Sequence, residues 1–95
     1  MHIGIVRLSL ALPSETLKEK RTIVRSVIER LRNRFNAAVA EVGDQDAPGR
    51  AVIAAAVIST DGAHAQSQLQ AIVDAVTASR LDVVLVDIET ETFAL

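Results

Sequence analysis

The segment from Thr16 to Asn36 constrains the fold most, because its apolar residues recur every three or four positions. This spacing places their side chains on one stripe of an α-helix, which needs a core to pack against. Thr16 and Glu19 form the S/T-x-x-E pattern of a capping box, so we predict a helix that begins at Leu17 and ends near Phe35. The stripe consists of Leu17, Val24, Val27, Ile28, Leu31 and Phe35.

Four strands and a second helix are predicted around this helix. The strands span residues 3–12, 37–42, 50–59 and 82–92, and the second helix is capped by Thr60-Asp61-Gly62 and ends near Ser79. The first and last strands alternate with a period of two, and the second is rich in small and branched residues. In the first strand, Val6, Leu8, Leu10 and Leu12 share one strongly apolar face. Residues 50–59 form a nearly continuous apolar run, which is typical of a central strand buried on both faces.

The order strand, helix, strand, strand, helix, strand restricts the topology. Crossover connections through helices are right-handed, which leaves the split βαβ arrangement as the simplest solution. We therefore predict an α+β fold, in which a four-stranded antiparallel sheet carries both helices on one face. The chain has 95 residues, of which 49% are apolar, and this length suits a single domain spanning residues 1–95.

The sheet face opposite the helices is predicted to be partly apolar. Strict alternation within residues 82–92 places Val84, Val86 and Ile88 on one face and the intervening residues on the other. The resulting patch consists of Ile3, Ile5, Val83 and Leu85, joined by one set of the apolar side chains of residues 51–58. Such a patch usually marks a subunit contact or is covered by the tail of the chain, and we predict that it mediates self-association into a homodimer or larger homo-oligomer.

The predicted first helix carries most of the positive charge of an acidic chain. The formal net charge is −2, yet residues 16–36 contain seven basic and two acidic residues. On a helical projection, one flank of the apolar stripe carries Lys18, Arg21, Arg25 and Arg32, and the other carries Arg30 and Arg34. The arginines near its C-terminal end suit the negative end of the helix dipole, which explains them as well as a binding role does. Lys18, Lys20 and Arg21 lie instead near its N-terminus, where the dipole disfavours cations by about 0.3 to 1 kcal/mol each. Their placement favours an anion-binding role.

Four short motifs occur in and after this helix. They are LKEKR at 17–21, RLRNRFN at 30–36, AEV at 40–42 and QD at 45–46. With them the chain resembles the YlxP-like family, a group of small bacterial domains of unknown function. The resemblance implies a ferredoxin-like fold and a cytoplasmic protein. Because members tend to be encoded near translation and ribosome-maturation genes, it also suggests contact with RNA or the ribosome. The chain departs from the family pattern at Thr16, where Ser is usual, and at residues 47–49, where Ala-Pro-Gly replaces bulkier residues.

Residue patterns that support catalysis are missing from the sequence. The two histidines, His2 and His64, lie in different elements without metal-ligand spacing, and the chain has no cysteine. Asp61 lies near His64, but no Ser or Cys in a nucleophile motif accompanies them. Asp44 and Asp46 lie in a Gly-containing loop, where closely spaced carboxylates are usually turn formers. We therefore predict a non-enzymatic protein without catalytic residues, metal, cofactor or small-molecule substrate.

Two functions remain open. Phe35 and Phe93 are the only aromatic residues, so the sheet is a poor platform for stacking bases, and RNA would instead be contacted through its phosphates. The predicted nucleic-acid-binding residues are Lys18, Lys20, Arg21, Arg25, Arg30, Arg32 and Arg34. The expected partner is a structured RNA or a ribosomal particle. The alternative is a homo-oligomeric protein-interaction module that does not bind nucleic acid.

The sequence also predicts a location. It begins directly with a predicted strand, and no apolar run approaches the roughly 18 residues of a membrane span. We therefore expect a soluble, cytoplasmic protein with no membrane partner.

Overall fold

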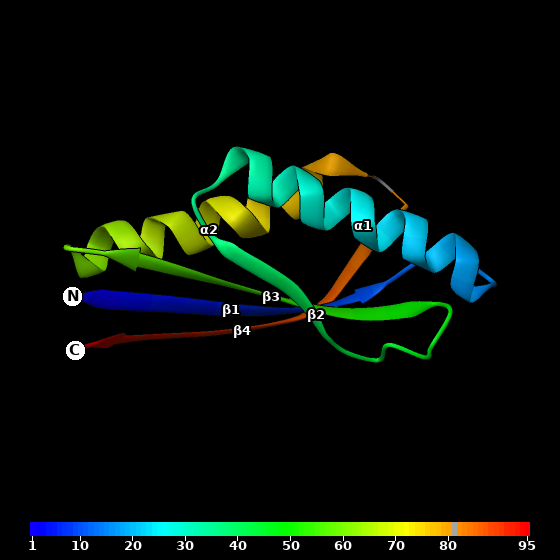
Figure 1. Cartoon of the computed structure of the whole chain (residues 1–95), viewed down its shortest axis with the longest axis horizontal. Coiled ribbons are helices and arrows are strands. Elements are labelled where there is room, and N and C mark those ends of the chain that lie inside the picture. Colours follow the sequence, from blue (N-terminus) through cyan, green and yellow to red (C-terminus); the bar gives the residue numbers. More distant parts are fainter. Residues whose placement is uncertain (81) are drawn as a thin grey trace.

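A computed structural model describes residues 1–80 and 82–95, and these contain the six predicted elements in the predicted order. The strands are β1 (His2–Ala11), β2 (Ala38–Gly43), β3 (Arg50–Ser59) and β4 (Val84–Ala94), and the helices are α1 (Leu17–Arg34) and α2 (Gly62–Ser79). The strands form one antiparallel sheet in the order β2-β3-β1-β4. Both helices cover the same face of this sheet (Figure 1). The predicted ferredoxin-like α+β fold is therefore confirmed.

The helices begin at side-chain caps that the sequence predicts. The backbone N–H of Glu19 donates to Thr16 Oγ1 over 3.2 Å, which satisfies one of the free donors of the first turn of α1. The Glu19 carboxylate accepts from the N–H of Glu15 at 3.2 Å, one residue before the cap. In α2, the N–H of Ala63 donates to Asp61 Oδ1 over 2.9 Å. These bonds explain why each helix begins where it does.

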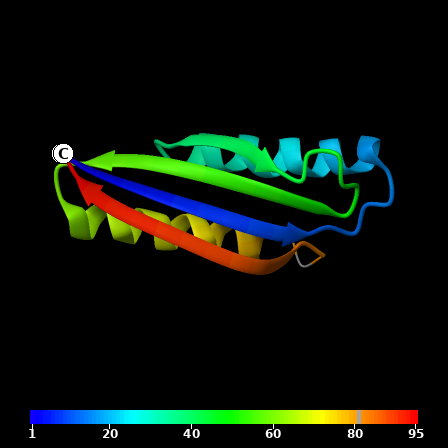
Figure 2. The same cartoon turned by 90° about the horizontal axis from the view of Figure 1, so that it is seen from below.

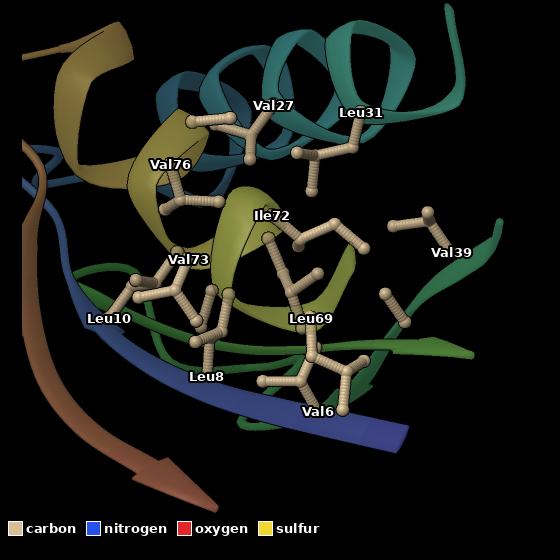
Figure 3. Packing of buried hydrophobic residues seen from close by; sticks show 14 of the residues in the cluster. Val6, Leu8, Leu10, Val27, Leu31, Val39, Leu69, Ile72, Val73 and Val76 are labelled. Carbon is tan, nitrogen blue, oxygen red and sulfur yellow. The ribbon is translucent and has the colours of Figure 1, made fainter. Parts of the chain in front are cut away.

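The hydrophobic core fills the space between the sheet and the two helices (Figure 3). Val6, Leu8 and Leu10 alternate along β1 and point toward the helices, as predicted. The core residues labelled on the helices and on β2 are Val27, Leu31, Leu69, Ile72, Val73, Val76 and Val39. Leu12, predicted to share the β1 core face, lies just past the strand end and packs against the core while partly buried.

Gly4 sets how closely α2 approaches the sheet. A Cβ atom at this position would lie 3.1 Å from Leu69 Cδ1 and 3.2 Å from Val57 Cγ2, which is closer than ordinary van der Waals contact. The missing side chain therefore lets Leu69 pack directly on β1.

The predicted facing of β4 is confirmed from Asp87 onward but is wrong for the residues before it, because this strand contains a bulge. Ser9 pairs with Asp87 and Leu10 pairs with Leu85, so Val86 is an extra residue between them. One extra residue reverses the faces of every side chain beyond it. Leu85 consequently packs against the core, and Ile88 also lies on the helix side, opposite Leu8.

Two of the four residues predicted for the outer patch are therefore not on it. Val83 precedes β4 and is buried in the core, and Leu85 is partly buried on the helix side. Ile3 and Ile5 do lie on the face away from the helices, because they alternate with Gly4 and Val6. The patch as predicted does not exist as one surface.

The prediction that β3 is buried on both faces is also wrong. The strand is central, between β2 and β1. Its helix-facing residues Ala51, Ile53, Ala55 and Val57 are buried. On the other face Ile58 is 69% exposed, because both helices pack on one side of the sheet.

The two helices divide the sheet between them. Helix α1 packs over β2 and β3, and α2 packs over β1, β3 and β4. Figure 2 shows α1 and β2 along one long edge of the molecule and α2 and β4 along the other. The cations of α1 are thus concentrated at one edge, whereas Asp87, Glu89 and Glu91 lie on the strand at the opposite edge. No helix in the described part of the chain is long and apolar enough to cross a lipid bilayer.

Candidate nucleic-acid interface

Lys18, Arg21 and Arg25 form an exposed row of cations along α1. The side chains of these three residues make no hydrogen bond or ion pair with any other residue in the described ranges. They are therefore available to a ligand without first breaking an internal contact.

A hollow of about 430 Å³ lies between α1 and the edge strand β2. Three guanidinium-bearing side chains, Arg21, Arg25 and Arg32, line it. Arg32 is fixed there, because its Nη2 donates to the carbonyl oxygen of Val39 on β2 at 2.6 Å. The predicted flank of Lys18, Arg21, Arg25 and Arg32 is thus brought together in part, with Lys18 outside the hollow.

Carboxylates and apolar groups complete the lining of this hollow. Val24 and Ile28 contribute apolar surface, and Glu29 and Glu41 contribute carboxylates. Glu29 follows Arg25 by four residues on the helix, a spacing at which opposite charges attract weakly. Glu41 already forms an ion pair with Lys20. The arginines therefore dominate the charge of the hollow.

Lys20, predicted to bind nucleic acid, is instead part of the core. The Lys20 side chain is only 1% exposed, and its Nζ lies 3.1 Å from Glu41 Oε2. The Glu41 side chain is 20% exposed. Nζ also donates to the carbonyl oxygen of Asp44. The Glu41 oxygen accepts no hydrogen bond, so its contact with Lys20 is an ion pair without hydrogen-bond alignment. The prediction for Lys20 is wrong, because no phosphate at the surface can reach its ammonium group.

The helical spacing already contained this information. Lys20 precedes Val24 by four residues and Val27 by seven, so it lies on the apolar stripe itself. Ile23, which the predicted stripe left out, is buried for the same reason. A lysine on a core stripe can be accommodated only when a carboxylate meets it, and Glu41 is supplied by another element.

Arg30 and Arg34 lie on the other side of α1. They border a shallow surface hollow of about 410 Å³ together with Ser26, Glu29 and Asn33. The guanidinium carbon of Arg34 lies 5.4 Å from the ring centroid of Phe35, a cation–π distance. The structure therefore keeps two basic flanks apart, as predicted from the helical projection.

The loop after β2 is fastened to the start of α1. Ser14 Oγ donates to the carbonyl oxygen of Pro48 at 2.6 Å, and the N–H of Leu12 donates to that of Gly49 at 2.8 Å. Asp44 has a φ of 55°, a left-handed conformation that Asp tolerates better than most residues. Together with the Lys20 contact, these bonds hold the loop against the helix that carries the cations.

One side-chain contact resembles part of a catalytic arrangement. Ser59 Oγ lies 3.1 Å from His64 Nδ1 and accepts a hydrogen bond from the N–H of Asp61 at 3.1 Å. The Asp61 carboxylate caps α2 at Ala63 instead of orienting the histidine, so the contacts belong to a helix start. Within residues 1–80 and 82–95, no group of three or more His, Cys, Asp or Glu side chains could hold a metal ion.

Comparison with known proteins identifies a family for this chain. The family described as "Protein of unknown function (DUF503)" matches residues 3–90. The chain belongs to this family. It is 33% identical over 55 residues to the uncharacterized protein YlxP of Bacillus subtilis (strain 168), a match that covers 58% of this chain and 60% of that protein.

One of the solved structures that this chain resembles shares its fold. The de novo designed protein Foldit4 superimposes with a TM-score of 0.53 at 12% identity and covers 98% of both chains. A Deinococcus radiodurans protein described as a candidate antibiotic biosynthesis monooxygenase aligns with a TM-score of 0.48 at 17% identity, over 100% of this chain and 92% of that one. The first likeness shows the fold alone, and the second is too distant to bear on function.

Proposed function

We propose that this chain is a non-enzymatic binding protein that contacts structured RNA or a ribosomal particle through the exposed cations of α1. The supporting observation is the hollow between α1 and β2, where Arg21, Arg25 and Arg32 converge on a chain whose net charge is −2. Planar guanidinium groups bind phosphate through paired hydrogen bonds, and three of them along one groove match a run of backbone phosphates.

The charge distribution makes the contact one-sided. Lys18 extends the row of arginines toward the N-terminus of α1, whereas the acidic strand β4 lies at the opposite edge of the sheet. RNA is therefore attracted to the α1 edge and repelled from the β4 edge. Contacts to phosphates supply affinity and orientation with little readout of bases, which suits a partner recognised by its shape.

The sheet is not a second RNA surface on this proposal. Phe93 on β4 is the one aromatic side chain on the face away from the helices, and Phe35 packs against the core. Single-strand platforms stack successive bases on several aromatic rings. Affinity should therefore depend on salt and on α1, and not on β1 and β3.

Conversion of Lys18, Arg21 and Arg25 together to Gln tests the proposal. The variant should bind ribosomal RNA more weakly, and the slope of log affinity against log salt should fall by roughly two to three, since each lost phosphate contact removes one counterion-release contribution. Lys20 is left in place because it is buried. Titrations at several salt concentrations measure the slope, and a thermal melt should show a variant no less stable than the parent, because cations near a helix N-terminus oppose the dipole.

The chain offers a charge-matched control. Arg7, Arg50 and Arg80 are the three basic residues outside α1, and their conversion to Gln changes the net charge by the same amount. If only net charge mattered, the slope of log affinity against log salt would fall by the same amount in both triple variants. Unchanged affinity and slope in a folded α1 variant, or equal losses in both variants, would contradict the proposal.

A protein-interaction module that does not bind nucleic acid is the second candidate function. The observation that favours it is the apolar character of the sheet face away from the helices, where Ile58, Ile5 and Phe93 are exposed. This candidate predicts that neither triple variant changes binding to ribosomal particles, because the parent does not bind them.

A further inference from the structure

We infer that two copies of this chain associate through the sheet face opposite the helices, hereafter the open face, with β3 at the centre of the contact. Figure 2 looks onto this face, and neither helix covers it. The inference is independent of the proposed RNA contact, because α1 lies on the other side of the sheet.

Large apolar side chains are aligned at one end of the open face. In the register of the sheet, Ile3 on β1 lies between Ile58 on β3 and Phe93 on β4. Ile58 is 69% exposed and Phe93 is 42% exposed. Contiguous apolar side chains on three neighbouring strands mark an interaction surface more strongly than scattered ones do.

The same face contains a hollow that such side chains can fill. Its volume is about 220 Å³, and it is lined by Ile5 and by backbone and small side chains of β2 and β3. Ala38 pairs with Ala56 and Ala40 with Ala54, so four alanines form its outward-facing lining. Projecting isoleucines beside an alanine hollow make one surface complementary to itself. A two-fold contact needs this property, because each copy must present both halves.

The charge of the outward side chains determines which part of the open face contacts the second copy. Asp87, Glu89 and Glu91 are outward-facing on β4, and Arg7 is paired with Glu89 at 2.6 Å. Stacking β4 of one copy on β4 of another would bring carboxylates together, which is unfavourable. On the other side of β1, the outward residues of β3 between Arg50 and Ser59 are all apolar. The overlap is therefore centred on β3, and β4 stays at its solvated rim.

The size of this region indicates a reversible contact. The ten residues of β1 and of β3 extend about 33 Å, the six of β2 extend about 20 Å, and strands lie about 4.8 Å apart, which gives a flat area of about 400 Å² per copy. Two such areas lie near the lower end of specific interfaces. Association should therefore depend on concentration, in the micromolar range or above.

Sedimentation velocity over a range of protein concentrations tests the inference with one variant. The parent should shift from the 10.2 kDa monomer toward twice that mass as its concentration rises to several hundred micromolar. Ile58→Glu should remain monomeric over the same range, because its carboxylate would be buried without a partner. Ile58 is exposed in the monomer, so the variant should fold normally.

Val86→Glu is the matched control. The exposed fraction of Val86, 66%, is close to the 69% of Ile58, but Val86 lies in the bulge of the outer strand β4. The Val86→Glu substitution adds the same charge and should leave the dissociation constant of self-association within about twofold of that of the parent. A parent that stays monomeric, an Ile58→Glu variant that still dimerises, or equal weakening by both substitutions would overturn the inference. None of these results would change the affinity expected for a short RNA, which contacts a single copy.

Discussion

Replacement of Lys20 by alanine is expected to lower the free energy of unfolding by about 3 to 5 kcal/mol. The substitution leaves the mostly buried carboxylate of Glu41 without its cation and the carbonyl oxygen of Asp44 without its donor. It also empties the space of a buried four-carbon stem. The 20% exposure of Glu41 lets water solvate part of the charge, which places the expected loss nearer the lower value. Denaturant unfolding measures it.

Two further variants separate the ion pair from simple loss of charge. Lys18→Ala removes a lysine two residues away that is exposed, and it should change stability by less than about 0.5 kcal/mol. The double variant Lys20→Met, Glu41→Leu replaces both charges with apolar groups and should recover most of the stability. If Lys20→Ala lowered the free energy of unfolding by less than about 1 kcal/mol, Lys20 would be solvated. Lys20 would then again be a candidate for contact with RNA.

Replacement of Leu31 by alanine is expected to cost about 2 to 5 kcal/mol. Leu31 is 2% exposed and lies among α1, α2 and β2 in the core (Figure 3), so the removed atoms would leave a cavity. Leu95, an exposed leucine at the end of the chain, provides the matched control, and its replacement by alanine should be nearly neutral. A loss under about 1 kcal/mol for Leu31→Ala in denaturant melts would mean that the core-facing side of α1 has been misassigned.

Helix α1 and the open face lie on opposite sides of the sheet, and the two proposed surfaces meet at the edge strand β2, where Ala40 lines both hollows. A dimer formed through the open face would carry one α1 helix on each outer layer, so its two cationic surfaces would face away from each other. Such a particle could bridge two RNA segments, because linked binding sites raise the effective concentration for the second contact. Ile58→Glu should then keep the intrinsic affinity for a short RNA and lose any gain seen on a long one.

Local patterns in the sequence were sufficient for the elements and their order. The capping residues Thr16 and Asp61 mark where the helices start, and the alternation of Val6, Leu8 and Leu10 identifies the core face of β1. Each of these features depends on neighbours within about four residues, which is the range over which periodicity and capping act. The right-handed crossover rule then restricted the topology.

The spacing of Lys20 places it on the core stripe of α1, but the tertiary structure decided which charged groups find partners and which apolar groups reach the surface. Lys20 is buried because Glu41 and Asp44 meet it from another strand and loop, and Arg32 is held beside Arg21 and Arg25 by a carbonyl group of β2. The bulge at Val86 reversed the faces of the residues before it and removed Val83 and Leu85 from the predicted patch. Strand register and ion-pair partners depend on residues far apart in the chain, so a period read along one segment cannot determine them.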